Sequence, residues 1–231
     1  MARVVVKISG KHVTPEKPGL LKSYARVLKS LAGEGLLAAV VVGGGRAARS
    51  YIDAARGAGL GNRSMLDMLG IEAARLNARL LAYLLHPHSH PEPPRSLWEA
   101  LQAAATGRIV VAGGFQPGQS TAAVAALLAE ALQADMLVLA TTVDGVYTSD
   151  PRRDRSARRL PRLTYQQLLR VLEQSLEPGR YELLDPLAVA VLERSGIPSR
   201  VVDGSDPENV ARAARGEPVG SLVEPSGGGS G

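Results

Sequence analysis

The stretch Leu37-Ala38-Ala39-Val40-Val41-Val42-Gly43-Gly44-Gly45 decides the fold, because it joins an apolar run to a glycine-rich turn. Six apolar residues in succession, with no polar alternation, are typical of a strand buried on both faces of a parallel sheet. Three further apolar runs end in the same way, in small or glycine residues: Arg3–Ile8, Arg108–Ala112 and Met136–Ala140.

Segments with helical periodicity separate these runs. Apolar residues recur every three or four positions in Leu20–Leu31, and Met65–Leu85 and Thr121–Leu132 are longer segments rich in Ala and Leu. Asp185-Pro186 and Asp206-Pro207 each read as a helix N-cap followed by proline at the first helical position. The alternation of strands and helices predicts an α/β fold, an αβα sandwich around a mainly parallel central sheet.

The composition fits one domain with an aliphatic core. Of 231 residues, 45% are hydrophobic and only 3% are aromatic. We expect a single domain over residues 1–225 and a flexible tail at 226–231, which holds only Ser and Gly. The absence of cysteine excludes disulfides, thiolate catalysis and Cys-ligated zinc. No signal peptide and no apolar run of about 20 residues is present, so we expect a cytoplasmic protein.

The glycine-rich turns predict an anion site. In a parallel sheet, ligands bind beyond the carboxyl ends of the strands, where glycine lets the backbone approach and the next helix presents unpaired N–H groups. The net charge of +5 favours anionic ligands without identifying them. No P-loop, dinucleotide-binding or protein-kinase motif occurs, so a phosphate site here belongs to another class.

Lys7 is a charged residue inside the first apolar run. A lysine in a buried strand is costly unless it meets an anion. Two interpretations are open: the ammonium leaves the sheet edge and is solvated, or it neutralises a transferring phosphoryl group, where charge develops in the transition state.

Four segments, taken in order, carry a resemblance to a known family. They are Lys7–Gly10 (KISG), Val42–Gly45 (VGGG), Gly113–Thr121 (GGFQPGQST) and Val143–Pro151 (VDGVYTSDP). Together with Asp67-x-x-Gly70-Ile71 and Tyr181–Ala188 (YELLDPLA), they make the chain resemble the amino-acid-kinase fold family, and within it the archaeal uridylate kinases. The resemblance covers residues 3–225; the two longest motifs are specific, whereas the triple glycine alone is not.

The resemblance implies transfer of the γ-phosphoryl group of MgATP to UMP, giving UDP and ADP in pyrimidine nucleotide biosynthesis without a covalent enzyme intermediate. The N-terminal half would hold UMP and the C-terminal half ATP. The resemblance also implies Mg²⁺ with ATP as cofactor, UTP as feedback inhibitor and a homohexamer built from dimers. From the residues themselves we expect no nucleic-acid partner, no membrane partner and no protein-bound metal site.

The family's binding residues transfer to this chain by position. Asp67 would accept hydrogen bonds from the ribose hydroxyls of UMP; as an alternative or in addition, it would cap a helix over Met68–Leu85. Arg49 would reach phosphate oxygens with its guanidinium fork, or it is a solvated helix residue. The full UMP set is Gly44, Asp67, Phe115, Gln116, Pro117, Gly118, Gln119, Ser120 and Thr121. The ATP phosphates would meet Gly10, Lys11, Gly45 and Arg49, and the adenosine would meet Thr141, Thr142, Tyr147 and Asp150.

The candidate catalytic residues are Lys7 and Asp144. Many relatives have an aspartate at the position of Ala122, and there it orients the catalytic lysine. Alanine cannot do this, so Asp144 is a possible substitute in this chain. Relatives often have asparagine at the position of Thr142. The threonine of this chain can still accept or donate one hydrogen bond there. Acetylglutamate kinases use a second lysine in the C-terminal half. This chain has no lysine after Lys29, which argues against that branch of the family.

Two alternative functions stay open at this point. One is a nucleotide-binding sensor or storage protein on the same fold, to which Ala122 gives some weight. The other is a different small-molecule kinase of the family, acting on a carboxylate, carbamate or isoprenoid phosphate.

Two further clusters point to simpler explanations. His86, His88 and His90 alternate in the proline-rich segment His86–Arg95, which we expect to be an exposed loop rather than a metal site. The basic run Arg152–Arg162 lacks interleaved aromatic residues, so a solvated loop beside the ATP site is favoured over nucleic-acid binding.

Overall fold

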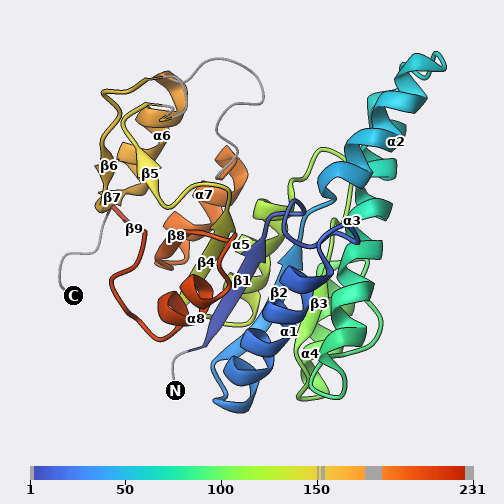
Figure 1. Ribbon diagram of the computed structural model, residues 1–231, viewed down its shortest axis with the longest axis horizontal. Coiled ribbons are helices and arrows are strands. Elements are labelled where there is room, and N and C mark those ends of the chain that lie inside the picture. Colours follow the sequence, from blue (N-terminus) through green and yellow to red (C-terminus); the bar gives the residue numbers. More distant parts are fainter. Residues whose placement is uncertain (1–2, 150, 152–153, 175–183, 227–231) are drawn as a thin grey trace.

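The computed structural model describes residues 3–149, 151, 154–174 and 184–226. Within this part of the chain, seven strands form one sheet in the order β3-β2-β1-β4-β8-β9-β7 (Figure 1). Neighbouring strands are parallel except for β8 and β9, which confirms the predicted mainly parallel sheet. The strands are β1 (Val4–Ile8), β2 (Leu37–Val42), β3 (Val110–Ala112), β4 (Met136–Thr141), β7 (Arg162–Thr164), β8 (Ser199–Asp203) and β9 (Ser221–Glu224).

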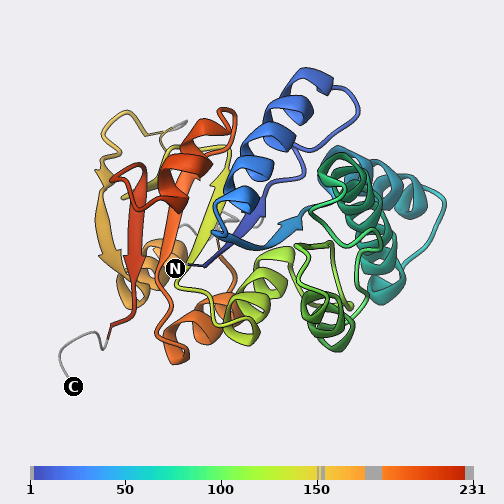
Figure 2. The ribbon, with the colours of Figure 1, turned by 90° about the horizontal axis from the view of Figure 1, so that it is seen from below.

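Helices cover both faces of this sheet, as the continuous apolar runs require. Figure 2 shows α1 and α8 on one side of the sheet and α5 and α7 on the other. The α1 side of the core is built by α1 (Pro18–Gly33), α3 (Arg63–Leu85) and α8 (Glu208–Ala214). The α5 side is built by α4 (Leu97–Ala105), α5 (Thr121–Ala131), α6 (Tyr165–Gln174) and α7 (Pro186–Arg194).

The alternation of side chains along β1 assigns each residue to one face. Val4, Val6 and Ile8 pack in the core on the α1 side, whereas Val5 packs on the α5 side. Lys7 pairs with Val41 and Leu139, which both belong to the α5-side core. The side chain of Lys7 therefore leaves the sheet on the α5 side, close to the carboxyl end of the strand.

One helix lies outside this layered arrangement. Helix α2 (Gly45–Gly57) packs along α3 and extends past the sheet (Figure 1). All of its residues are described, and none of its side chains is buried. Its apolar contribution to the core is accordingly small, and its position depends on α3 and on the glycine turn before it.

The helix starts are mostly those that the sequence predicts. Asp185 caps α7 by accepting a hydrogen bond from the Ala188 amide at 3.0 Å. At Asp206-Pro207 the helix starts one residue later than expected, at Glu208. The predicted capping role of Asp67 is wrong, because α3 starts at Arg63 and Asn62 caps it, accepting from the Met65 amide at 3.1 Å.

Short pieces of strand complete the described fold. β5 (Val146–Tyr147) and β6 (Arg159–Leu160) form an antiparallel pair after β4. The segment 86–95 is an irregular connection, as predicted, apart from one bridge between Ser89 and Ile109. Among the described residues, no helix combines the length and apolarity that crossing a membrane requires. Of the expected flexible tail, residues 227–231 lie outside the described residues.

Candidate active site

The carboxyl ends of β1, β2, β3 and β4 lie at one edge of the sheet, because these four strands are parallel. Each is followed by one of the glycine or small-residue turns that the sequence singles out. We call this edge the glycine edge; its turns are residues 9–12, 43–45, 113–120 and 142–145.

Two of these turns pack backbone against backbone. A Cβ placed on Gly10 would lie 2.2 Å from the Gly43 carbonyl oxygen and 2.3 Å from the Gly45 amide nitrogen. Gly45 also has a φ of +63°, in the left-handed region that favours glycine. These glycines are therefore required by the contact between the turns, in addition to any contact with a ligand.

Helix α3 holds the glycine edge from the side. The buried amide of Asn77 donates to the carbonyl oxygens of Gly43 at 3.0 Å and Gly44 at 3.3 Å. Arg75 donates to the carbonyl oxygens of Gly114 at 3.1 Å and Phe115 at 3.0 Å. Sequence reasoning missed both residues, since nothing in a helical Ala/Leu-rich segment signals which polar side chains meet a distant turn.

A pocket of about 360 Å³ lies where the 9–12 turn meets the start of α2. Its wall carries four cations and one acid, and we call it the cationic pocket. Within the described part of the chain, none of these four cations forms an ion pair. Unpaired cations around a pocket suit a polyanionic ligand. The lining residues are Gly10, Lys11, Thr14, Glu16, Lys17, Arg46 and Arg49.

The structure thus brings Gly10, Lys11 and Arg49 together, as predicted for a phosphate site. Gly45 is not in the wall but contacts Gly10 directly. Lys17 and Arg46 join the same pocket and were not predicted. Both could have been found from the sequence, since each lies within a few residues of a predicted glycine turn.

A second pocket, of about 330 Å³, lies between α3 and the 113–120 turn, and we call it the α3 pocket. Gly44, Asp67 and Gly118–Thr121, all predicted to contact one nucleotide, lie together in its wall. The remaining wall is formed by small and apolar residues: Ile52, Gly70, Ile71, Ala74 and Gly114.

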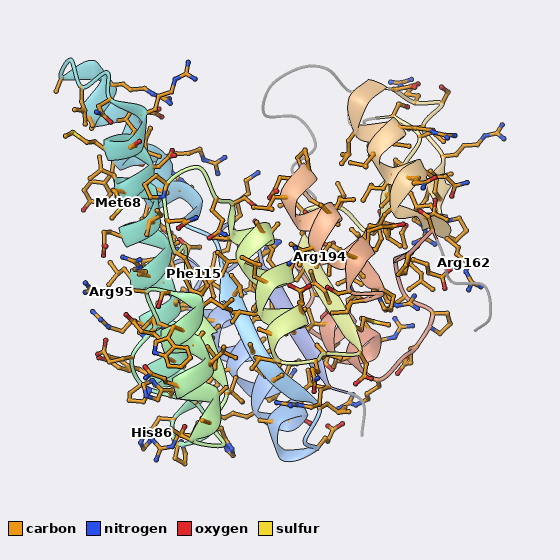
Figure 3. All side chains as sticks on the ribbon, turned by 180° about the vertical axis from the view of Figure 1, so that it is seen from behind. Met68, His86, Arg95, Phe115, Arg162 and Arg194 are labelled. Carbon is orange, nitrogen blue, oxygen red and sulfur yellow. The ribbon has the colours of Figure 1, made fainter. Side chains whose placement is uncertain are left out.

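Three residues of the predicted set lie outside this wall. The Phe115 side chain is buried in the α5-side core, while Gln116 and Pro117 are exposed on the turn. Their role in binding stays a prediction. Figure 3 shows Phe115 on the side of α3 that faces the sheet, with Met68 and His86 toward opposite ends of α3.

Asp67 is tied to the turn that it faces. One of its carboxylate oxygens accepts a hydrogen bond from the Gly118 amide at 2.9 Å. Nearby, the side-chain oxygen of Gln119 is buried and has no hydrogen-bond partner among the described residues. A buried acceptor without a partner in a pocket wall is a place where a ligand donor would be stabilising.

Ser120 joins two helix starts. Its hydroxyl caps α5 by accepting from the amides of Ala122 and Ala123, each at 3.0 Å. The same hydroxyl donates to the carboxylate of Asp185, which in turn caps α7. Both helices lie on the face of the sheet toward which Lys7 points, so this pair lies on the same side of the glycine edge as the lysine.

The turn after β4 carries the other predicted catalytic residue. One carboxylate oxygen of Asp144 accepts from the Tyr147 hydroxyl at 2.7 Å, and the other pairs with Arg159 at 3.3 Å. The hydrogen bond to Asp144 raises the pKa of Tyr147. The catalytic role of Asp144 and the adenosine contacts of Thr141, Thr142 and Tyr147 stay predictions, and Asp150 lies outside the described residues.

A buried polar group underlies the 9–12 turn. His12 is only 4% exposed, and its Nε2 lies 2.9 Å from the carbonyl oxygen of Thr141, at the end of β4. Burial lowers the pKa of His12, and the nearby charges of Lys17 and Lys11 act in the same direction. The Tyr24 hydroxyl donates to Gly204 beside it, at 2.6 Å. This packing ties the first glycine turn to β4 and β8.

Neither the histidines of the 86–95 segment nor the described arginines of the basic run line the cationic pocket or the α3 pocket. The expectation of a loop throughout the basic run is wrong, because Arg159 belongs to β6 and Arg162 to β7. The described residues contain no group of three or more His, Asp or Glu side chains placed to hold a metal ion. His90 instead makes a local contact with the carbonyl oxygen of Glu92 at 3.0 Å. In the basic run, Arg159 pairs with Asp144 and Arg162 with Glu224; Arg152 and Arg153 lie outside the described residues.

Similar proteins agree with this architecture. The chain is 65% identical over 220 residues to the uridylate kinase of Hyperthermus butylicus, covering 95% of this chain and 97% of the relative. It is 44% identical over 225 residues to the uridylate kinase of Sulfurisphaera tokodaii, covering 96% and 99%. The crystal structure of uridylate kinase from Archaeoglobus fulgidus superimposes with a TM-score of 0.86 at 39% identity, covering 96% of this chain and 99% of that one.

The family assignment follows from sequence and structure together. Residues 2–203 match the family model described as the amino acid kinase family. This match spans β1 to the end of β8, and so includes all four turns of the glycine edge. The chain belongs to the amino acid kinase family.

Proposed function

We propose that this protein is a UMP kinase, which transfers the γ-phosphoryl group of ATP to UMP and releases UDP and ADP. The observation that carries the proposal is the pair of pockets at the glycine edge. The cationic pocket and the α3 pocket share the segment 44–52 as a common wall, since Gly44 and Ile52 line one and Arg46 and Arg49 line the other. Relatives named uridylate kinase, similar over nearly the whole chain, support UMP as the acceptor.

In this proposal the cationic pocket binds the donor phosphates and the α3 pocket binds UMP. Mg²⁺ enters with the triphosphate as part of the substrate. A phosphate oxygen of UMP attacks the γ-phosphorus, the bond from that phosphorus to the bridging oxygen breaks, and the electron pair leaves with ADP. Such a transfer has a loose transition state, so the protein contributes positioning and charge neutralisation rather than covalent chemistry.

Each predicted group has a defined task in this reaction. Lys7 would neutralise charge on the transferring group, since its side chain leaves the sheet at the edge where the turns meet. Asp67, held by the Gly118 amide, would orient the acceptor through its remaining lone pairs. Arg49 and Lys11 would hold the donor phosphates.

The same proposal extends to the setting of the enzyme. We infer a cytoplasmic enzyme of pyrimidine nucleotide biosynthesis, inhibited by UTP and assembled as a homohexamer built from three dimers. Support for self-association comes from large apolar side chains that are exposed on α3 and α4, namely Leu76 at 65%, Tyr83 at 58% and Trp98 at 69%. Monomeric proteins rarely leave such a group of side chains in water without a binding role.

One assay tests this function against the alternatives. ADP release from ATP would be measured with UMP, CMP, acetylglutamate and isopentenyl phosphate as acceptors. We expect turnover with UMP well above that with the other three. Preference for another acceptor would indicate a different kinase of the family, and tight UTP binding without any turnover would indicate a sensor.

A further inference from the structure

The 113–120 turn is held in place from two directions. Helix α3 anchors its first part, through Arg75 on the carbonyl oxygens of Gly114 and Phe115, and Asp67 on the Gly118 amide. Its last residue, Ser120, is anchored by Asp185 at the start of α7. This bond ties the turn to α7, a helix near the C-terminal end of the described chain.

The hydroxyl of Ser120 has no capacity left. A serine hydroxyl offers one donor and two acceptor lone pairs. Here both lone pairs accept from the amides of Ala122 and Ala123, and the hydrogen is donated to Asp185. Asp185 therefore determines the orientation of Ser120, and Ser120 contributes to the α3 pocket by its position rather than by a free hydroxyl.

Asp185 is itself fixed. Its second carboxylate oxygen accepts from the Ala188 amide at 3.0 Å, so both oxygens are engaged at helix N-termini, where a negative charge is stabilised. The two positions considered earlier for a lysine-orienting carboxylate do not contact Ser120 through one. Ala122 presents a buried methyl group, and the Asp144 carboxylate is occupied by Tyr147 and Arg159.

We propose that Asp185 is a positioning residue for the acceptor, which acts through Ser120 to hold the segment Gly118–Thr121 in the wall of the α3 pocket. The inference rests on the proposed function, because it takes UMP as the ligand of that pocket. It assigns to α7, in the half of the chain attributed to the donor, a direct part in forming the acceptor site.

Asp185→Asn is the informative variant. Asparagine caps a helix as well as aspartate does, so the start of α7 is preserved. If the asparagine carbonyl oxygen still accepts the hydrogen bond from the Ala188 amide, its NH₂ group faces Ser120. The lone pairs of that hydroxyl already accept hydrogen bonds from two backbone amides, so they are not available to the NH₂ group. The Asp185–Ser120 bond is therefore lost while size and cap are retained. Asp206→Asn is the matched control, since Asp206 also accepts a backbone amide, from Glu208 at 3.0 Å, beside α8.

We expect Asp185→Asn to raise KM for UMP, and the Kd of UMP measured calorimetrically without ATP, by about tenfold or more. KM for ATP and the melting temperature should stay close to those of the unmodified chain and of Asp206→Asn. In a Ser120→Ala background, the same substitution should change the Kd of UMP by less than about twofold, because residues that act through one contact are not additive.

Equal effects of Asp185→Asn with and without Ser120 would overturn the inference, and so would an unchanged Kd of UMP. A variant that merely unfolds would lower the melting temperature and the affinities for both nucleotides together, which also contradicts a positioning role. The proposed function is tested separately, since UMP binding without turnover in the unmodified chain would defeat the kinase assignment and leave the calorimetric comparison intact.

Discussion

Lys7 and Asp67 show how single side chains reach the glycine edge from opposite sides. Lys7 lies on β1 in register with Val41 and Leu139, and its side chain leaves the sheet on the α5 side. Asp67 lies in the second turn of α3 and binds the Gly118 amide. In the proposed function, Lys7 neutralises charge on the transferring phosphoryl group, and Asp67 holds both the turn and the acceptor.

For Lys7→Ala we expect a folded protein whose kcat is reduced by about 10²- to 10³-fold, because a preorganised charge at the reacting group is removed. Steady-state kinetics with UMP and ATP would measure the loss, and circular dichroism would verify the fold. Lys22→Ala, on the exposed side of α1, is the control. Near-normal turnover of Lys7→Ala would contradict its catalytic role.

For Asp67→Asn we expect KM for UMP to rise by about tenfold, with KM for ATP nearly unchanged. The asparagine oxygen can still accept from the Gly118 amide, so the turn is kept, while a charged acceptor for the ligand is lost. Initial-rate measurements with each substrate varied in turn would show the difference. Equal changes in both constants would count against a contact with the acceptor.

At the scale of elements, the sequence was informative where a segment is long and uniform. The four apolar runs contain β1 to β4. A continuous apolar run is typical of a strand that helices cover on both faces, so these four strands could be recognised in the sequence. The strands β5, β6, β7 and β9 have two to four residues each and mix polar with apolar positions, so no periodicity identifies them. Some side chains form hydrogen bonds with turns that are distant in sequence, as Asn77, Arg75 and Asp185 do. Such partners follow only from the tertiary fold.

Arg46, at the start of α2, and Lys17, just before α1, line the cationic pocket although the sequence did not predict them. We expect Arg46→Gln to raise KM for ATP by about tenfold, the effect of one lost charge-assisted hydrogen bond, and Lys17→Gln to act in the same direction. KM for UMP should change by less than about twofold. Arg56→Gln, at the far end of the same helix, is the control, since Arg56 lies beside Asp53 at 3.9 Å and outside the cationic pocket.

Initial rates at several salt concentrations would add a second criterion. The KM for ATP of the unmodified chain should rise with salt more steeply than that of the Arg46 variant. Salt screens the attraction between each unpaired cation of the pocket and the ATP phosphates, and the variant has one such cation fewer. An Arg46→Gln enzyme with unchanged KM for ATP and unchanged salt dependence would show that this arginine is only a solvated helix residue.

At the scale of the whole molecule, the candidate site lies at one edge of the sheet, whereas the outer surface of α3 and α4 carries exposed apolar side chains. We expect the double variant Leu76→Glu, Trp98→Glu to have a lower molar mass in solution than the unmodified chain. A subunit contact through this surface would have to bury the new carboxylates, and their desolvation costs free energy. Size-exclusion chromatography with light scattering would measure the molar mass. Leu187→Glu, 47% exposed on α7, is the control. An unmodified chain that is monomeric at micromolar concentration would contradict the proposed hexamer.

Helix α2 buries none of its side chains, yet residues 44–52 form a wall of both pockets. Its conformational freedom is therefore restrained chiefly by α3 before any nucleotide binds. A ligand in either pocket restricts the same helix, and the second ligand then loses less entropy on binding. The two substrates should bind with positive cooperativity, and thermodynamic linkage requires the coupling factor to be the same in both directions. Calorimetric titration of UMP with and without a non-hydrolysable ATP analogue, and of the analogue with and without UMP, would yield that factor twice.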